Sequence, residues 1–212
     1  MPDAELSTPD SQDAAQATAP VRKRPKPGER RVQILQALAT MLEQPGAERV
    51  TTAALAARLE VSEAALYRHF ASKAQMFEGL IEFIEQSVFS LVNQIMEREL
   101  AANEQAARIV AMLLQFAEKN PGMTRVMVGD ALVFENERLQ QRMNQFFDKI
   151  EATLRQSLRS GGEADAATPS ADAQVKASML TSFAVGRLQR FARSGFKRVP
   201  SEHLEASLAR IL

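Results

Sequence analysis

The side chains with the most useful chemistry gather in residues 62–69, where hydrogen-bond donors follow small residues. A helix with alanines near its start can lie close against the base edges of a duplex, since no bulky side chain holds it away. Hydroxyl, guanidinium and imidazole groups further along the same helix can donate to phosphates. The pattern therefore favours binding to nucleic acid. The residues concerned are Ser62, Ala64, Ala65, Tyr67, Arg68 and His69.

Two short helices and the start of a third are needed to hold this segment, and each has a start signal. Thr51 and Thr52 precede an apolar run and can supply an oxygen to the free amides of a first helix. Ser62 repeats the signal for a second helix, and Ser72, followed three residues later by glutamine, has the form of a capping box. The third helix then begins at Lys73 and is much longer.

Leu66 and Phe70, four residues apart, would pack inward and seat the second helix. The polar residues named above would then lie on or near its outer side. An ordinary helical hairpin has the same spacing, so spacing alone does not separate a DNA-binding unit from a hairpin.

The string VSEAALYRHFASKAQMF, residues 61–77, resembles the DNA-binding end of the TetR family of dimeric regulators. The likeness continues through IEFIEQSV, NPGMTRVMVGDALVFE, RLQQRMNQFFDKIEATLRQ and FKRVP, and there it is similar to the nucleoid occlusion factors of that family. It implies an all-α fold with a three-helix helix-turn-helix unit at 29–74 and a helical dimerisation and effector bundle at 75–212. Residues 1–28 form a tail outside both.

Two sets of DNA contacts follow from the residues and the resemblance together. Phosphate contacts are expected from Thr51 or Thr52 and from Lys73, where the lysine charge and a helix N-terminus act together. The resemblance implies the same role for Tyr67 and His69. Contacts to base edges are expected from the remaining residues, Ser62, Ala64, Ala65 and Arg68. Glu60 departs from the family pattern, because it stands at a turn where glycine is usual.

Composition narrows the classes of function. The chain has 212 residues, 45% of them hydrophobic, no cysteine and two histidines. It can bury a substantial core, but it has no thiol chemistry, no zinc-finger ligands and no glycine-rich phosphate loop. We therefore expect no enzyme, no cofactor and no metal, and we take Glu135 and Glu137 for a solvated helix start. Without a signal peptide or a membrane-spanning stretch, we expect a soluble protein in the cytoplasm. The resemblance to nucleoid occlusion factors implies that it is associated with the nucleoid.

Charge is unevenly distributed in a chain whose formal net charge is zero. Residues 1–20 contain four acidic residues and no basic residue, in a composition typical of disorder. A basic arm follows and is expected to reach phosphate or a minor groove, unless it is only a solvated linker. The basic residues of this arm are Arg22, Lys23, Arg24, Lys26, Arg30 and Arg31.

The remaining chain has helical periodicity throughout. Leu35 to Leu42 predict a first helix, and Asn120-Pro121-Gly122 should end a helix that starts after Asn103. A short apolar helix is expected at 124–134, long helices near 139–158 and 175–191, an exposed loop at 161–171 and a terminal helix from Pro200. No segment alternates enough to predict a strand.

The resemblance implies a homodimer formed by the last two long helices. The candidate seam consists of Phe183, Val185, Gly186, Leu188 and Phe191. Any one of these side chains is, taken alone, more typical of an internal core.

Two uses of the central helices stay open. Most TetR relatives are repressors that admit a small molecule, and a pocket lined by Met112, Phe116, Met123, Met127, Phe134 and Phe147 would suit one. Core filling is the more usual role of such side chains, because flexible methionines commonly occupy irregular gaps. Resemblance to the nucleoid occlusion factors instead implies contact with FtsZ, the tubulin-like division GTPase. Phe83 and Asn120 match that surface, Lys119 stands on it where arginine is usual, and Leu91 stands where a basic residue is expected.

Overall fold

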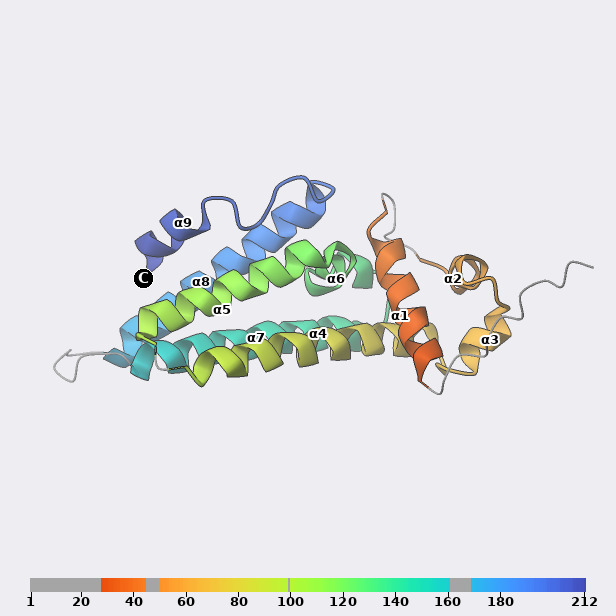
Figure 1. Ribbon diagram of the computed structural model, residues 1–212, viewed down its shortest axis with the longest axis horizontal. Coiled ribbons are helices and arrows are strands. Elements are labelled where there is room, and N and C mark those ends of the chain that lie inside the picture. Colours follow the sequence, from red (N-terminus) through yellow and green to blue (C-terminus); the bar gives the residue numbers. More distant parts are fainter. Residues whose placement is uncertain (1–27, 45–49, 99, 161–168) are drawn as a thin grey trace, which may run out of the picture.

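The computed structural model describes residues 28–44, 50–98, 100–160 and 169–212, and within these ranges it is all helix and turn. This confirms the predicted all-α class. Figure 1 shows the order of the elements. They are α1 (Glu29–Leu42), α2 (Thr52–Arg58), α3 (Glu63–Tyr67), α4 (Lys73–Met96), α5 (Ala102–Lys119), α6 (Pro121–Met127), the 3-10 helix η2 (Asp130–Leu132), α7 (Glu137–Ser160), α8 (Pro169–Arg193) and α9 (Leu204–Ile211).

The molecule is elongated, with α1, α2 and α3 at one end and a bundle of long helices at the other (Figure 1). We call α1–α3 the N-terminal unit. Helix α4 begins beside that unit and runs the length of the bundle, where it packs against α5 and α7. Helix α8 packs along α7 and also contacts α5, and α9 lies against α8.

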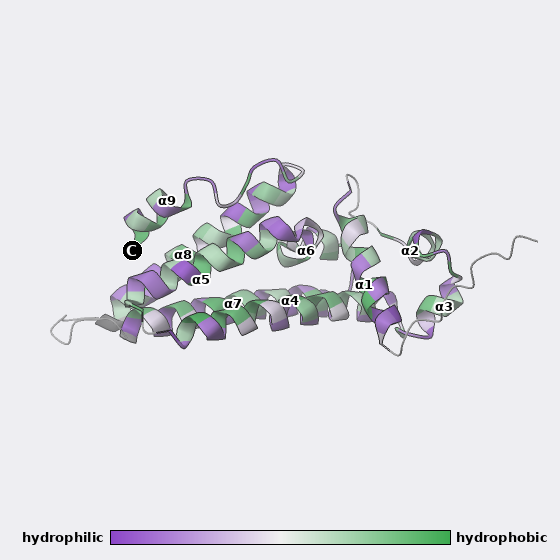
Figure 2. Ribbon diagram, in the orientation of Figure 1, coloured by the Kyte–Doolittle hydropathy of each residue, from purple (hydrophilic) through white to green (hydrophobic). Residues whose placement is uncertain are grey.

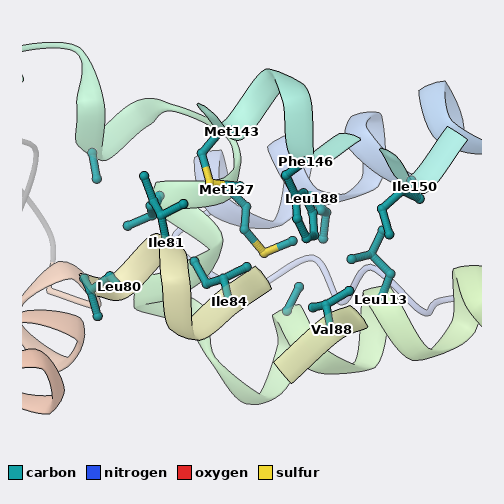
Figure 3. Packing of buried hydrophobic residues seen from close by; sticks show 14 of the residues in the cluster. Leu80, Ile81, Ile84, Val88, Leu113, Met127, Met143, Phe146, Ile150 and Leu188 are labelled. Atoms are coloured by element: carbon teal, nitrogen blue, oxygen red, sulfur yellow. The ribbon is translucent and has the colours of Figure 1, made fainter. Parts of the chain in front are cut away.

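One hydrophobic core runs through both ends of the molecule. The bundle helices carry apolar and polar sides (Figure 2), and their apolar side chains meet in the interior, as Figure 3 shows for Ile84, Leu113 and Phe146. All three are completely buried. Burial of such stripes, more than intrinsic propensity, stabilises helices of this length.

Helix α5 ends at Lys119, as the Asn120-Pro121-Gly122 signal predicts, but Pro121 and Gly122 belong to the next helix and not to a loop. Proline is suited to the first helical position because its missing amide hydrogen has no helical partner there. Gly122 is required by packing, since a Cβ at this position would lie 1.9 Å from the carbonyl oxygen of Ala39 on α1.

Three predicted boundaries were wrong. The terminal helix expected from Pro200 begins at Leu204. The helix expected at 124–134 ends at Met127, because Gly129 adopts a positive φ of 83° and turns the chain into η2. The loop expected at 161–171 is shorter at its far end, since α8 already begins at Pro169. Residues 161–168 lie outside the described ranges.

Candidate nucleic-acid interface

The starts of α2 and α3 are fixed by capping hydroxyl groups at the predicted positions. Thr51 Oγ1 accepts a hydrogen bond from the amide of Ala54 at 3.2 Å, and Ser62 Oγ accepts one from Ala65 at 3.3 Å. Thr52 Oγ1 donates to Glu63 Oε2 at 2.6 Å, so the first turns of the two helices are also tied to each other. Both hydroxyl caps keep a proton that can be donated to a phosphate.

Helix α3 is seated as the sequence predicts. Leu66 and Phe70 are each 1% exposed. The residues on the other side, which we call the α3 face, are all exposed, whereas Ala65 is half-buried. The α3 face consists of Ala64, Tyr67, Arg68 and His69. It therefore presents one small side chain and three hydrogen-bonding groups to the solvent.

Arg31 is used inside the N-terminal unit. Its guanidinium lies 4.1 Å from the centroid of the Phe70 ring, and its Nη1 donates to the carbonyl oxygen of His69 at 2.8 Å. Arg30 donates to Gln33 at 3.1 Å. Both arginines belong to the first turn of α1, so they are not part of an extended arm. The rest of the predicted basic arm, Arg22, Lys23, Arg24 and Lys26, lies outside the described residues.

The turn between α2 and α3 has the left-handed backbone that its family position requires. Glu60 has a φ of 53° and its amide donates to the carbonyl oxygen of Ala57 at 3.1 Å. A residue with a Cβ is strained in this conformation by about 1 kcal/mol relative to glycine.

Lys73, the predicted phosphate contact, begins α4 after a well-formed cap. Ser72 Oγ accepts from the amide of Gln75 at 3.2 Å, and the Gln75 side chain accepts from the amide of Ala71 at 2.8 Å. The Lys73 ammonium forms an ion pair with Glu135, whose side chain is only 10% exposed. The interpretation of Glu135 as a solvated residue was therefore wrong. It precedes α7 and is paired with the N-terminal end of α4.

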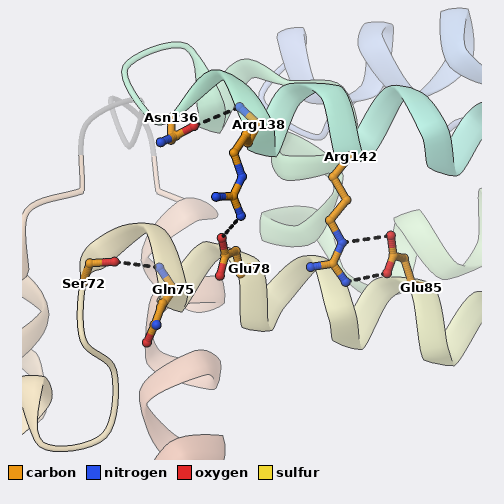
Figure 4. A network of polar contacts seen from close by, with 7 residues as sticks. All are labelled: Ser72, Gln75, Glu78, Glu85, Asn136, Arg138 and Arg142. Atoms are coloured by element: carbon orange, nitrogen blue, oxygen red, sulfur yellow. Dashed lines mark hydrogen bonds and ion pairs between the residues drawn. The ribbon is translucent and has the colours of Figure 1, made fainter.

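Two further ion pairs fasten α4 to α7 (Figure 4). Arg142 donates twice to the carboxylate of Glu85, at 2.6 and 3.2 Å, and Arg138 pairs with Glu78 at 3.3 Å. The hydrogen bonds that Arg142 donates to the Glu85 carboxylate raise the pKa of Arg142 above its ordinary value. Of the two pairs, the bidentate one is the more shielded from solvent and the more restrictive in geometry.

Comparison with known proteins assigns the family. Residues 34–80 match the model of the bacterial regulatory proteins of the tetR family, and residues 102–211 match the SlmA-like, tetracyclin repressor-like C-terminal domain. Over 177 residues the chain is 51% identical to the nucleoid occlusion factor SlmA of Idiomarina loihiensis, which covers 84% of this chain and 90% of that protein. The chain belongs to the SlmA group of nucleoid occlusion factors, within the TetR family.

Two further comparisons agree. The nucleoid occlusion factor SlmA of Shewanella pealeana is 52% identical over 174 residues, which is 82% of this chain and 88% of that protein. A TetR transcriptional regulator from Legionella pneumophila shares the fold with a TM-score of 0.68, although it is 16% identical, over 87% of this chain and 97% of that one.

In this SlmA-group chain the residues predicted to bind a partner differ in their exposure and in their hydrogen bonds within the fold. Phe83 on α4 is 47% exposed, and Leu91, two turns further along the same helix, is 40% exposed. Lys119 is exposed at the end of α5. Asn120 is committed to the fold, because its side-chain amide donates to the carbonyl oxygen of Phe116 at 2.7 Å. It joins α5 to α6 and offers less to a partner than Phe83 does.

The predicted seam divides in the same way. Phe183, Val185 and Gly186 are partly exposed on α8, whereas Leu188 and Phe191 are 0% and 4% exposed. Leu188 points into the bundle core in Figure 3. These two are therefore core residues in the protomer and not available to a second copy. The predicted seam omits Val175 and Met179, which are 57% and 48% exposed and precede Phe183 at intervals of four. This spacing of four residues, which places them on the same helix face as Phe183, was the sequence signal that could have identified them.

The predicted ligand pocket does not gather its residues. Met127 is buried in the core, whereas Phe134 is 69% exposed at the surface. The other four, Met112, Phe116, Met123 and Phe147, are partly buried and pack against the core. An open groove does occur between α5 and α9, lined among others by Ala107, Ala111 and Leu204.

Among the residues that the structure describes, three or more histidine and acidic side chains do not gather as a metal site would require. Helices of the length and apolar character needed to cross a bilayer are likewise absent from the described ranges.

Proposed function

We propose that the protein is a homodimer that binds a near-palindromic duplex through two α3 faces and, held over the chromosome, binds FtsZ and antagonises its assembly there. The observation that carries the DNA-binding half is the exposed α3 face above the buried Leu66 and Phe70. The shared description of the relatives carries the division-inhibiting half.

On DNA, each α3 enters a major groove with Ala64 leading. Ser62 and Ala65 at the start of α3, and Arg68 at its end, approach base edges, while Tyr67 and His69 donate to phosphates. Thr51, Thr52 and Lys73 contact the backbone on either side. The two half-sites of a symmetric dimer lie about 34 Å apart or at a multiple of that spacing.

The dimer is formed by α7 and α8. Val175 and Met179 are exposed on α8, and the partly exposed Phe183 and Gly186 continue the same row over the next turns. A Cβ at Gly186 would meet nothing within 4 Å in the protomer. The open space beside Gly186 allows a second helix to approach closely.

The DNA contacts are tested by salt dependence. Lys73→Ala should weaken binding to every duplex sequence and reduce the slope of log affinity against log salt by about one unit. Lys149→Ala removes an exposed lysine from α7 and serves as the matched control. An unchanged slope in Lys73→Ala would remove this residue from the phosphate contacts.

The FtsZ contact is centred on Phe83, which stands on the outer side of α4 with Leu91 in line with it. An exposed aromatic side chain beside polar groups is the usual kind of anchor for a partner. Phe83→Ala should leave dimerisation and DNA binding intact. In a sedimentation assay with palindromic DNA, FtsZ polymer should remain pelletable with this variant, whereas the native protein reduces it. Val199→Ala, at the same 47% exposure, is the control and should retain full antagonism.

The same assay separates this function from a ligand-controlled repressor. Loss of FtsZ polymer that depends on DNA supports the division inhibitor. No effect on FtsZ, together with release of DNA by a metabolite, contradicts it and identifies a repressor.

A further inference from the structure

Two negatively charged groups compete for the Lys73 ammonium: the carboxylate of Glu135 and, under the proposed function, a DNA phosphate. In the free protein its ammonium is paired with Glu135, and it lies 5.7 Å from the centroid of the Phe77 ring. The lysine side chain is 27% exposed and that of Glu135 only 10%, so the pair is more shielded than the Arg138–Glu78 pair beside it. Shielded pairs contribute more than fully exposed ones, because solvent screens them less.

The two partners belong to different parts of the molecule. Lys73 occupies the first turn of α4, directly after the N-terminal unit, and the Ser72 and Gln75 caps fix that turn. Glu135 belongs to the segment between α6 and α7, residues 128–136, which we call the connector. Its amide donates to the carbonyl oxygen of Leu132 at 3.0 Å.

A phosphate and the Glu135 carboxylate cannot both lie against this ammonium without cost. Two anions brought within a few ångströms repel each other, by about 1 kcal/mol or more where water is partly excluded. When Lys73 turns toward DNA, Glu135 must therefore give up its partner. A largely buried carboxylate without a partner is unfavourable, so loss of the ion pair favours a movement of the connector that carries it.

We propose that the Lys73–Glu135 pair is a latch that DNA opens, and that Glu135 thereby sets both the affinity for DNA and the conformation of the connector. This inference rests on the proposed phosphate contact of Lys73. The connector links α6, which packs against α1 and α8, to α7, and it exposes Val133 and Phe134 at 68% and 69%. By reciprocity, a ligand that holds the opened connector raises the affinity for DNA by the same factor by which DNA raises affinity for that ligand.

The latch is tested by a double-mutant cycle on DNA binding at low salt. Glu135→Gln keeps the shape of the side chain, removes its charge and should raise affinity for the palindromic duplex about 3- to 10-fold. Lys73→Ala should lower affinity, and Glu135→Gln added to Lys73→Ala should change nothing further. If the gain persists without Lys73, the carboxylate acts only through its general charge and the latch is refuted.

Glu78→Gln is the matched control, since it also removes a carboxylate from an ion pair between α4 and α7. It should change affinity less than Glu135→Gln does, and an equal gain in both would overturn the latch. The proposed function fails separately: if Lys73→Ala binds DNA as tightly as the native chain, the phosphate contact itself is wrong.

Hydrogen exchange provides a second measurement on the native protein. Adding the palindromic duplex should speed exchange in the connector, including the Glu135 amide that bonds to Leu132. Glu135→Gln should show the fast exchange before DNA is added. Unchanged or slower exchange in the native connector on DNA would contradict the proposal even if the variants bind as expected.

Discussion

The N-terminal unit and the bundle reach stability by different means. Helices α2 and α3 have 7 and 5 residues, whereas α4 and α7 have 24 each. Helices as short as α2 and α3 do not persist alone in water. They depend on hydroxyl caps, the Thr52–Glu63 bond and a few buried side chains. The bundle distributes its stability over many contacts, so loss of one group should damage the N-terminal unit locally and the bundle more evenly.

The largest expected effect is the loss of Phe70. Its ring is 1% exposed, packs under the Arg31 guanidinium and adjoins Gly79 on α4. Phe70→Ala should cost about 3–5 kcal/mol of the free energy that holds the N-terminal unit folded. We expect α2 and α3 to lose protection in hydrogen exchange while α5, α7 and α8 keep theirs, and DNA binding should be abolished.

Phe146→Ala is the matching substitution in the bundle. Phe146 is completely buried and packs edge-on against Phe89 and Phe147. Phe146→Ala should lower the urea midpoint of the whole molecule, and no single segment should unfold before the rest. Equal local loss of α2 and α3 in both variants would show that the two regions do not differ as argued.

The second prediction concerns the joint between the two regions. Gly122 on α6 faces the backbone of α1, and a Cβ would lie 1.9 Å from the carbonyl oxygen of Ala39. Since neither backbone can move aside freely, Gly122→Ala should lower the free energy of unfolding by about 1–3 kcal/mol or more, as measured by thermal unfolding. It should also shift α1 and with it α3, so DNA affinity should fall even at temperatures where the chain is folded. A variant with native melting and native DNA affinity would show that α1 and α6 dock more loosely.

Local signals explain why the N-terminal unit was easier to predict than the rest. Thr51, Ser62 and Ser72 all cap helices where the sequence placed them, since a cap depends on residues within one turn. The role of Glu135 was missed because its partner is 62 residues away. Periodicity also found the apolar stripe of α8, but it does not separate the side that faces the core from a side left open. Leu188 and Phe191 were therefore assigned to a seam, and Val175 and Met179 were left out of it.

Gly186→Ala tests the open side of α8, with a smaller expected effect. In a helix that faces only solvent, alanine is more favourable than glycine by about 1 kcal/mol. If a second copy lies against Gly186, the added methyl group should instead weaken dimerisation by about 10-fold. We expect the weakening, measured by sedimentation across a dilution series. Tighter or unchanged association with a higher melting temperature would place the seam elsewhere.

The smallest effect is expected where both regions have the same backbone strain. Glu60 in the N-terminal unit and Phe196 after α8 have positive φ angles of 53° and 64°. Glu60→Gly should relieve the strain and stabilise the unit by up to about 1 kcal/mol, part of which is offset by the greater freedom of glycine in the unfolded chain. Glu60→Ala, which keeps the Cβ, should not.

Phe196→Gly relieves the same strain but should destabilise the protein, since this ring packs against Phe191 at 5.2 Å and lies beneath the guanidinium of Arg125. Opposite signs in urea unfolding are therefore expected from two chemically similar changes at the two ends of the molecule. Two gains of equal size would mean that backbone strain outweighs ring packing at Phe196, and that the bundle end is held no more firmly by its side chains than the turn at Glu60.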